Sequence, residues 1–217
     1  MIQLFHVYKS YERNTTALSD VSIKVGRGEF VFLAGQSGAG KSTMLKMLYA
    51  AETPTAGQVL VNNTNINRLG SSGVARLRRD IGVVFQDFRL IPWYTVYENV
   101  ALPLDVARRD RGMIRGRVLA WLEHVGLAHK HRAYPRQLSG GEQQRVAIAR
   151  AMVVEPSLVL ADEPTGNLDP ELTREVISLF HEVNARGATV VFATHDRTIL
   201  QSHHKRVITL RRGRVAE

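Results

Sequence analysis

An eight-residue run near the N-terminus limits the possible folds of this chain more than any other feature. Residues 35–42 read Gly-Gln-Ser-Gly-Ala-Gly-Lys-Ser, which fits the phosphate-binding pattern of Gly, four residues and Gly-Lys-Ser/Thr. The apolar residues 30–34 predict a buried strand before the run, and residues 42–48 predict a helix after it. A chance match in a chain of this length is on the order of one in a hundred. The pattern therefore predicts a strand–loop–helix unit of an α/β protein.

The residue types of this loop suit the binding of a nucleotide. Its glycines let several backbone N–H groups converge on one phosphate, and the helix N-terminus adds partial positive charge. Lys41 can reach β- and γ-phosphates, and the Ser42 hydroxyl can hold Mg²⁺. We expect the nucleotide to be bound by Gly35, Ser37, Gly38, Ala39, Gly40, Lys41, Ser42 and Thr43.

Composition narrows the class of protein. The 217 residues are enough for one domain with a substantial core, and the absence of cysteine excludes a disulfide framework and a thiolate metal site. No apolar run approaches the roughly 20 residues that cross a bilayer, and the N-terminus is strand-like rather than a signal peptide. We therefore expect an intracellular protein whose role at a membrane depends on a partner.

The chain is basic, with a net charge of +9 and clusters of Lys and Arg over residues 76–79, 108–117 and 205–214. Such a surface could contact nucleic acid, anionic lipid or an acidic partner. Solvated faces that keep the protein soluble explain the clusters equally well. The clusters also lack the interleaved aromatic residues of a surface that binds single-stranded nucleic acid.

The hydrophobic pattern predicts eight strands with helices between the later ones. Strands that follow one another directly near the N-terminus favour an antiparallel layer, whereas the later alternation favours a parallel sheet. Residues 87–137 predict helices and loops, with helical segments at 94–102 and 113–125. Asp169 as N-cap and Pro170 as the next residue begin a helix that Gly187 ends. The predicted strands are residues 2–8, 21–25, 30–34, 58–61, 81–85, 158–161, 189–194 and 207–210.

Two adjacent carboxylates end the apolar strand at residues 158–161. Burying such a pair is costly unless a cation meets it. Asp162 suits coordination of Mg²⁺, and Glu163 suits a residue that orients or deprotonates an attacking water. An ordinary strand end with exposed charges is the alternative, and the phosphate loop in the same chain argues against it.

A second candidate anion site lies at residues 138–145, Leu-Ser-Gly-Gly-Glu-Gln-Gln-Arg. Ser139 and two glycines begin a helix there, where free amides and a hydroxyl can bind an anion. A simply capped helix is an equally good interpretation of this spacing. Two phosphate sites in one chain are redundant unless two subunits use them on the same nucleotide.

These runs together resemble the ATP-binding subunits of ATP-binding cassette (ABC) systems over essentially the whole chain. Residues 138–144 resemble the family signature, and Gln86 resembles the glutamine that touches Mg²⁺ and senses the partner. Asn167, Leu168 and Asp169 resemble the loop that crosses the dimer interface. His195 resembles the histidine that contacts the γ-phosphate, and Tyr11 is placed like the aromatic residue that stacks on adenine.

The resemblance implies a P-loop α/β fold with a RecA-like parallel core and an N-terminal antiparallel layer. It implies one domain over residues 1–217, with a catalytic core of 1–86 and 138–217 and an inserted helical subdomain of about 87–137. It also implies that two copies bind two ATP molecules head to tail. Ser139, Gly141 and Asp169 would act at that interface, with Ser139 and Gly141 gripping the γ-phosphate of the other copy. The implied catalytic residues are Glu163, His195, Lys41 and Gln86, and the implied Mg²⁺ ligands are Ser42, Gln86 and Asp162.

Finer features resemble one branch of this family. Residues 161–169 resemble the group that serves cell division, lipoprotein release and macrolide export, and residues 85–87 with 95–101 are most similar to its cell-division branch. That resemblance implies an FtsX-type transmembrane subunit, a position on the cytoplasmic face of the bacterial inner membrane at the septum, and control of cell-wall hydrolysis. Residues 89–94 lie where the family docks its membrane subunit, but they do not identify which membrane subunit binds. A lipoprotein-release or macrolide-type exporter is therefore the alternative.

Two more distant functions are disfavoured. ABC ATPases that act on nucleic acid resemble fused cassettes, or carry coiled-coil insertions or zinc-binding cysteines, and this chain has none of these features. A regulator that binds ATP without hydrolysing it would not need both Glu163 and His195.

Overall fold

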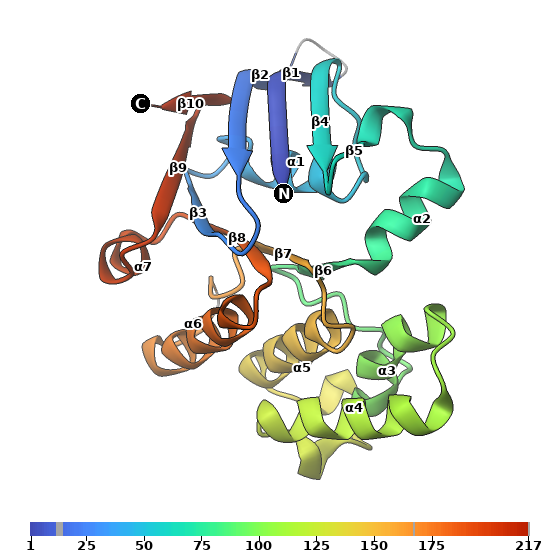
Figure 1. Ribbon diagram of the computed structural model, residues 1–217. Helices are drawn as coiled ribbons and strands as arrows, with labels where there is room; N and C mark the ends of the chain where they lie inside the picture. The colour runs from blue at the N-terminus through green and yellow to red at the C-terminus, as the bar shows by residue number, and fades with distance from the viewer. Residues whose placement is uncertain (12–14, 167, 217) are drawn as a thin grey trace.

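The computed structural model describes residues 1–11, 15–166 and 168–216, which form two sheets with helices between and below them (Figure 1). The first sheet is antiparallel and follows the order β2-β1-β4-β5. Its strands are β1 (Ile2–Tyr11), β2 (Thr15–Val25), β4 (Ala56–Val61) and β5 (Thr64–Asn65).

The second sheet has the order β10-β9-β3-β8-β7-β6. Strands β9, β3, β8, β7 and β6 run parallel, and β10 pairs with β9 in the antiparallel sense. Every residue of β3 and β8 is buried, as expected for central strands covered on both faces. The bounds are β3 (Phe30–Ala34), β6 (Ile81–Val84), β7 (Leu158–Asp162), β8 (Thr189–Thr194), β9 (Arg206–Arg211) and β10 (Arg214–Ala216).

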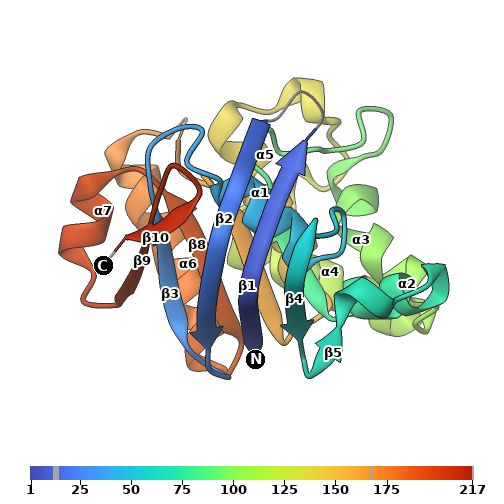
Figure 2. The same cartoon turned by 90° about the horizontal axis from the view of Figure 1, so that it is seen from above.

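Alternate residues of the parallel strands build two separate cores, because successive side chains point to opposite faces of a sheet. Leu33 and Leu160 join one face of helix α1 (Lys41–Leu48) and the antiparallel sheet in one core. Phe32 and Phe192 face the other way, into a core built with the remaining large helices. Helix α1 thus lies between the two sheets (Figure 2).

The helices of the second core cover the far face of the parallel sheet (Figure 1). Helices α5 (Gly140–Met152) and α6 (Pro170–Ala185) lie below the strands, and α3 and α4 pack on α5. The other helices are α2 (Ser71–Arg79), α3 (Val96–Val106), α4 (Arg111–His124) and α7 (Arg197–Ser202), with 3-10 turns at Ile66–Arg68, Ala128–Lys130 and Pro135–Gln137.

All eight predicted strands are present, and β1, β2, β4, β7 and β9 are longer than predicted. Strand β2 begins at Thr15 rather than residue 21, because residues 15–20 continue its pairing with β1. The short strands β5 and β10 and the helices α2 and α7 were not predicted, since each has too few apolar residues to give a periodic pattern. The bounds 87 and 137 of the helical subdomain stay a prediction.

The parallel arrangement brings four distant segments to one edge. The C-terminal end of β3 leads into the phosphate loop, and that of β7 ends in Asp162. Gln86 follows β6 closely, and His195 follows β8 directly. Because neighbouring parallel strands end at the same edge of a sheet, residues some 160 positions apart converge there.

Candidate functional site

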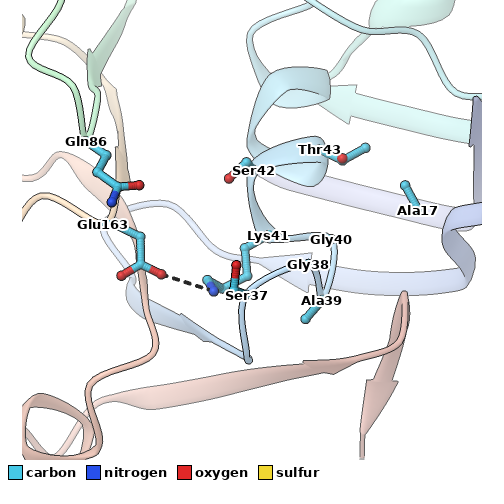
Figure 3. A pocket seen from close by; sticks show the side chains of 10 residues that line it. All are labelled: Ala17, Ser37, Gly38, Ala39, Gly40, Lys41, Ser42, Thr43, Gln86 and Glu163. Atoms are coloured by element: carbon cyan, nitrogen blue, oxygen red, sulfur yellow. Dashed lines mark ion pairs between the residues drawn. The ribbon is translucent and has the colours of Figure 1, made fainter. Parts of the chain in front are cut away.

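A cavity of about 190 Å³ opens beside the phosphate loop (Figure 3). The loop and the start of α1 form one side, and Gln86 and Glu163 lie on the other. The residues that line it are Ala17, Ser37, Gly38, Ala39, Gly40, Lys41, Ser42, Thr43, Gln86 and Glu163. The structure therefore brings most of the predicted nucleotide-binding residues together in one place.

The loop packs closely against strand β2, which explains one of its glycines. Gly40 is the N-cap of α1 with a φ of 105°, a conformation that favours glycine. A Cβ atom there would lie 2.7 Å from the carbonyl oxygen of Ala17. Gly40 is therefore needed both for the turn and for the close approach of the loop to Ala17. No sequence motif marks Ala17, which lines the cavity only because β2 passes it.

The Lys41 ammonium is buried among oxygen atoms. Its Nζ donates hydrogen bonds to the carbonyl oxygens of Gly35 at 2.6 Å and Gln36 at 3.3 Å. The same Nζ lies 3.1 Å from Glu163 Oε1. Gly35 thus contributes its carbonyl to Lys41 rather than lining the cavity. A buried charge requires such partners, and phosphate oxygens are the natural replacement for them.

Glu163 connects the loop to the predicted histidine. Its Oε2 atom lies 2.7 Å from His195 Nδ1, while its Oε1 atom contacts Lys41. Glu163 has a φ of 50°, and its backbone N–H donates to the Ala193 carbonyl at 3.0 Å. A left-handed conformation is unfavourable for a residue with a Cβ, and such strain is concentrated at functional sites. The backbone thus turns the Glu163 side chain into the cavity.

Asp162 is suited to a hard cation. Its Oδ1 atom is buried and has no hydrogen-bond partner among the described residues. Burial raises the pKa of this carboxyl, and a hydrogen bond from Ser42 opposes the shift. Carboxylate, hydroxyl and amide oxygens of Asp162, Ser42 and Gln86 match the preference of Mg²⁺ for oxygen ligands.

The protein alone supplies few metal ligands at this place. Within the described ranges, no group of three or more His, Cys, Asp or Glu side chains could hold a metal ion. Mg²⁺ usually binds through one or two carboxylates together with phosphate oxygens and waters. The residues present therefore fit a Mg²⁺ ion that arrives with the nucleotide.

Tyr11 lies next to the start of α1. Its hydroxyl is 3.5 Å from Thr43 Oγ1, and the Lys9 ammonium lies 4.9 Å from its ring centroid. The side chain is 38% exposed, so an aromatic face is available beside the loop. The adenine-stacking role of Tyr11 stays a prediction.

Ser139 and Gly141 lie at the N-terminus of α5 and do not line the cavity. Ser139 forms a capping box with Glu142: its Oγ accepts from the Glu142 N–H at 3.3 Å, and Glu142 Oε2 accepts from the Ser139 N–H at 2.9 Å. A Cβ at Gly141 would lie 2.6 Å from Leu172 Cδ1, so α5 and α6 meet closely here. Asp169 caps α6. Asn167 lies outside the described residues.

The arrangement of these residues defines a class of protein. A phosphate loop after β3, a carboxylate pair at the end of β7 and a polar residue after β8 form the site of a P-loop nucleoside triphosphatase.

Similarity to known proteins narrows this class to one family. The ABC transporter family matches residues 18–166. The cell division ATP-binding protein FtsE of Bacillus subtilis is 50% identical over 213 residues, which cover 98% of this chain and 93% of the relative. FtsE of Escherichia coli is 48% identical over 98% of this chain and 96% of its own length. A solved dimeric ABC cassette, MJ0796 bound to ADP and phosphate, superposes with a TM-score of 0.92 at 40% identity and covers 100% of this chain and 97% of that one.

The chain therefore belongs to the ABC transporter family and, within it, to the FtsE cell division ATP-binding proteins. It is an ATP-binding ATPase of the ABC type. None of the helices among its described residues is long and apolar enough to cross a membrane.

Glu142 makes the stability of helix α5 depend on pH. A hydrogen bond from the Lys130 ammonium, followed by one from the Ser139 backbone, lowers the pKa of Glu142. A carboxyl whose pKa is lower in the folded protein stabilises the fold above its unfolded pKa of about 4.3, and this stabilisation is lost as the pH falls through the folded value.

We predict that Glu142→Gln lowers the free energy of unfolding at pH 7 by about 0.2–1 kcal/mol, since the Lys130 pair is partly exposed. The difference from the wild type should shrink as the pH is lowered below the unfolded pKa. Urea unfolding across this pH range measures it, with Glu123→Gln on the exposed face of α4 as the matched control. A deficit that is constant or grows toward acid pH would contradict the assignment.

Proposed function

We propose that the chain is the ATP-hydrolysing subunit of an FtsEX-like complex, in which ATP cycling acts through a transmembrane partner on cell-wall hydrolysis during division. The observation that carries the proposal is that FtsE proteins are about 50% identical to this chain over nearly its full length. The cavity lined by the phosphate loop, Gln86 and Glu163 supports it.

The triphosphate of ATP would lie along the loop, with its β- and γ-phosphates at the Lys41 ammonium and the loop amides. Lys41 would then exchange Gly35, Gln36 and Glu163 for phosphate oxygens. Ser42, Gln86 and Asp162 would hold Mg²⁺, which neutralises phosphate charge when bound. Tyr11 would stack on the adenine.

Release of Lys41 leaves Glu163 free to act on water. A water molecule attacks the γ-phosphorus, a new P–O bond forms, and the bond to the bridging oxygen of ADP breaks. The proton of the water passes to the Glu163 carboxylate, which acts as general base. His195, which contacts Glu163 at 2.7 Å, would orient this carboxylate and contact the γ-phosphate.

A second copy of the chain would complete each site. Ser139 and Gly141 begin α5 outside the cavity lining, so the N–H groups at this helix start are available to the γ-phosphate of another copy. Asp169, at the start of α6, would lie at the same interface. The similar cassette MJ0796 is described as a dimer, which supports this arrangement.

We predict that Glu163→Gln lowers kcat for ATP hydrolysis about 100-fold or more, because it removes the general base. The variant should also retain ATP and accumulate as a dimer. Phosphate release and light scattering measure the two effects on the complex with its membrane partner. Glu155→Gln, an exposed substitution of the same chemistry, serves as the control. Hydrolysis at the wild-type rate would overturn the role of Glu163.

The membrane partner would dock beside the start of α3. Residues 89–94 connect Gln86 to this helix, and Trp93 is 74% exposed within them. A large exposed aromatic residue is typical of the centre of a protein interface. We place the complex on the cytoplasmic face of the bacterial inner membrane, at the division septum, with the basic surface near anionic lipid as a further contact.

We predict that tagged Glu163→Gln, loaded with ATP and added to detergent-solubilised native membranes, captures an FtsX-type protein together with division factors. Mass spectrometry of the captured material identifies the partner, and Lys41→Ala, which cannot hold the phosphates, is the control. Recovery of a lipoprotein-release or macrolide-export permease instead would leave the nucleotide chemistry intact and overturn the cell-division assignment.

A further inference from the structure

Arg150, in the last turn of α5, holds two successive carbonyl groups of the segment that follows Gln86. Its Nη1 atom donates to the Arg89 carbonyl oxygen and its Nη2 atom to the Phe88 carbonyl oxygen, both at 2.6 Å. Burial lowers the pKa of Arg150 to about 10, so the guanidinium is still charged at neutral pH. A half-buried cation with two short bonds to adjacent carbonyls is a specific clamp on the backbone.

The clamped backbone is in an unfavourable conformation. Phe88 and Arg89 have φ values of 57° and 49°, although neither is glycine. Residues with a Cβ adopt this region only where their surroundings impose it. Two such residues in succession turn both carbonyls toward the same guanidinium. Arg150 is therefore one of the contacts that hold this turn.

Further contacts align the segment with α5. The Arg89 guanidinium lies 4.1 Å from the Phe85 ring centroid, and its Nε is 3.2 Å from Asp87 Oδ1. A Cβ at Gly140 would lie 3.9 Å from Phe88 Cζ. The segment thus lies against α5 near Gly140 and is hydrogen-bonded to the last turn of the helix by Arg150.

We propose that Arg150 is a positioning residue for ATP hydrolysis, because it holds the turn at Phe88 and Arg89 and thereby fixes Gln86 two residues earlier. The inference rests on the proposed function, in which Gln86 acts at the nucleotide. The clamp also makes α5, whose N-terminus would serve the ATP of the other copy, move together with Gln86 of its own cavity. One arginine thus couples the two sites of the dimer.

The test begins with Arg150→Lys, which keeps the charge but cannot present two parallel N–H donors to the two carbonyls. We expect kcat to fall roughly 5- to 30-fold, because the loss of one such interaction changes the fraction of molecules with a correctly placed Gln86 by about this factor. The KM for ATP should change little, since Lys41 and the loop are untouched. The measurement uses the complex with its membrane partner.

A rescue experiment separates positioning from general damage. Glycine adopts positive φ without strain, so Arg89→Gly should restore most of the kcat lost in Arg150→Lys. Arg89→Ala removes the same contacts to Phe85 and Asp87 but keeps a Cβ, and it should not restore kcat. Rescue by both substitutions, or by neither, would overturn the proposal, as would a wild-type kcat in Arg150→Lys.

A readout independent of turnover uses Trp93, which lies four residues beyond Arg89. In a Trp121→Phe background, acrylamide quenching of Trp93 should change when MgATP is added to the wild type and to Arg150→Lys/Arg89→Gly. It should change less in Arg150→Lys and in Arg150→Lys/Arg89→Ala. An identical response in all four proteins would contradict the coupling. Failure of the wild type itself to bind or hydrolyse ATP would instead overturn the proposed function, so the two failures are distinguishable.

Discussion

The buried ammonium of Lys41 is the constraint on which the rest of the site depends. A charge that is only 6% exposed is unfavourable unless anionic or carbonyl oxygens surround it. The chain supplies Gly35, Gln36 and Glu163 at this place. These oxygens occupy positions where phosphate oxygens would satisfy the same cation. In the proposed mechanism, nucleotide binding exchanges the partners of Lys41, and this exchange frees the carboxylate that would activate water.

The parallel sheet makes the exchange possible, because it ends three neighbouring strands at one edge. Lys41 follows β3, Glu163 follows β7 and His195 follows β8, and these strands are adjacent in the order β3-β8-β7. The two cores on either side of the sheet fix that edge through side chains such as Phe32 and Leu33, which point to opposite faces. The helices α3 and α5, at which we propose that a membrane partner and a second copy bind, belong to only one of these cores.

Local patterns predicted most of the helices and strands, whereas contacts between distant segments could not be predicted. The loop at 35–42, the strand before Asp162 and the cap at Asp169 are each encoded within about ten residues. The pairing of Lys41 with Glu163 depends on strand order, which no local pattern contains. Likewise, Ala17 lines the cavity because β2 crosses the loop, and Arg150 contacts Phe88 and Arg89 from 61 or 62 residues away.

A crystal structure of the chain with a non-hydrolysable ATP analogue and Mg²⁺ would test the exchange at Lys41 most directly. The account predicts that Lys41 Nζ contacts β- and γ-phosphate oxygens, and that its present 3.1 Å contact with Glu163 Oε1 is broken. Glu163 should then face the γ-phosphate. A bound triphosphate with the Lys41–Glu163 ion pair intact would contradict the account.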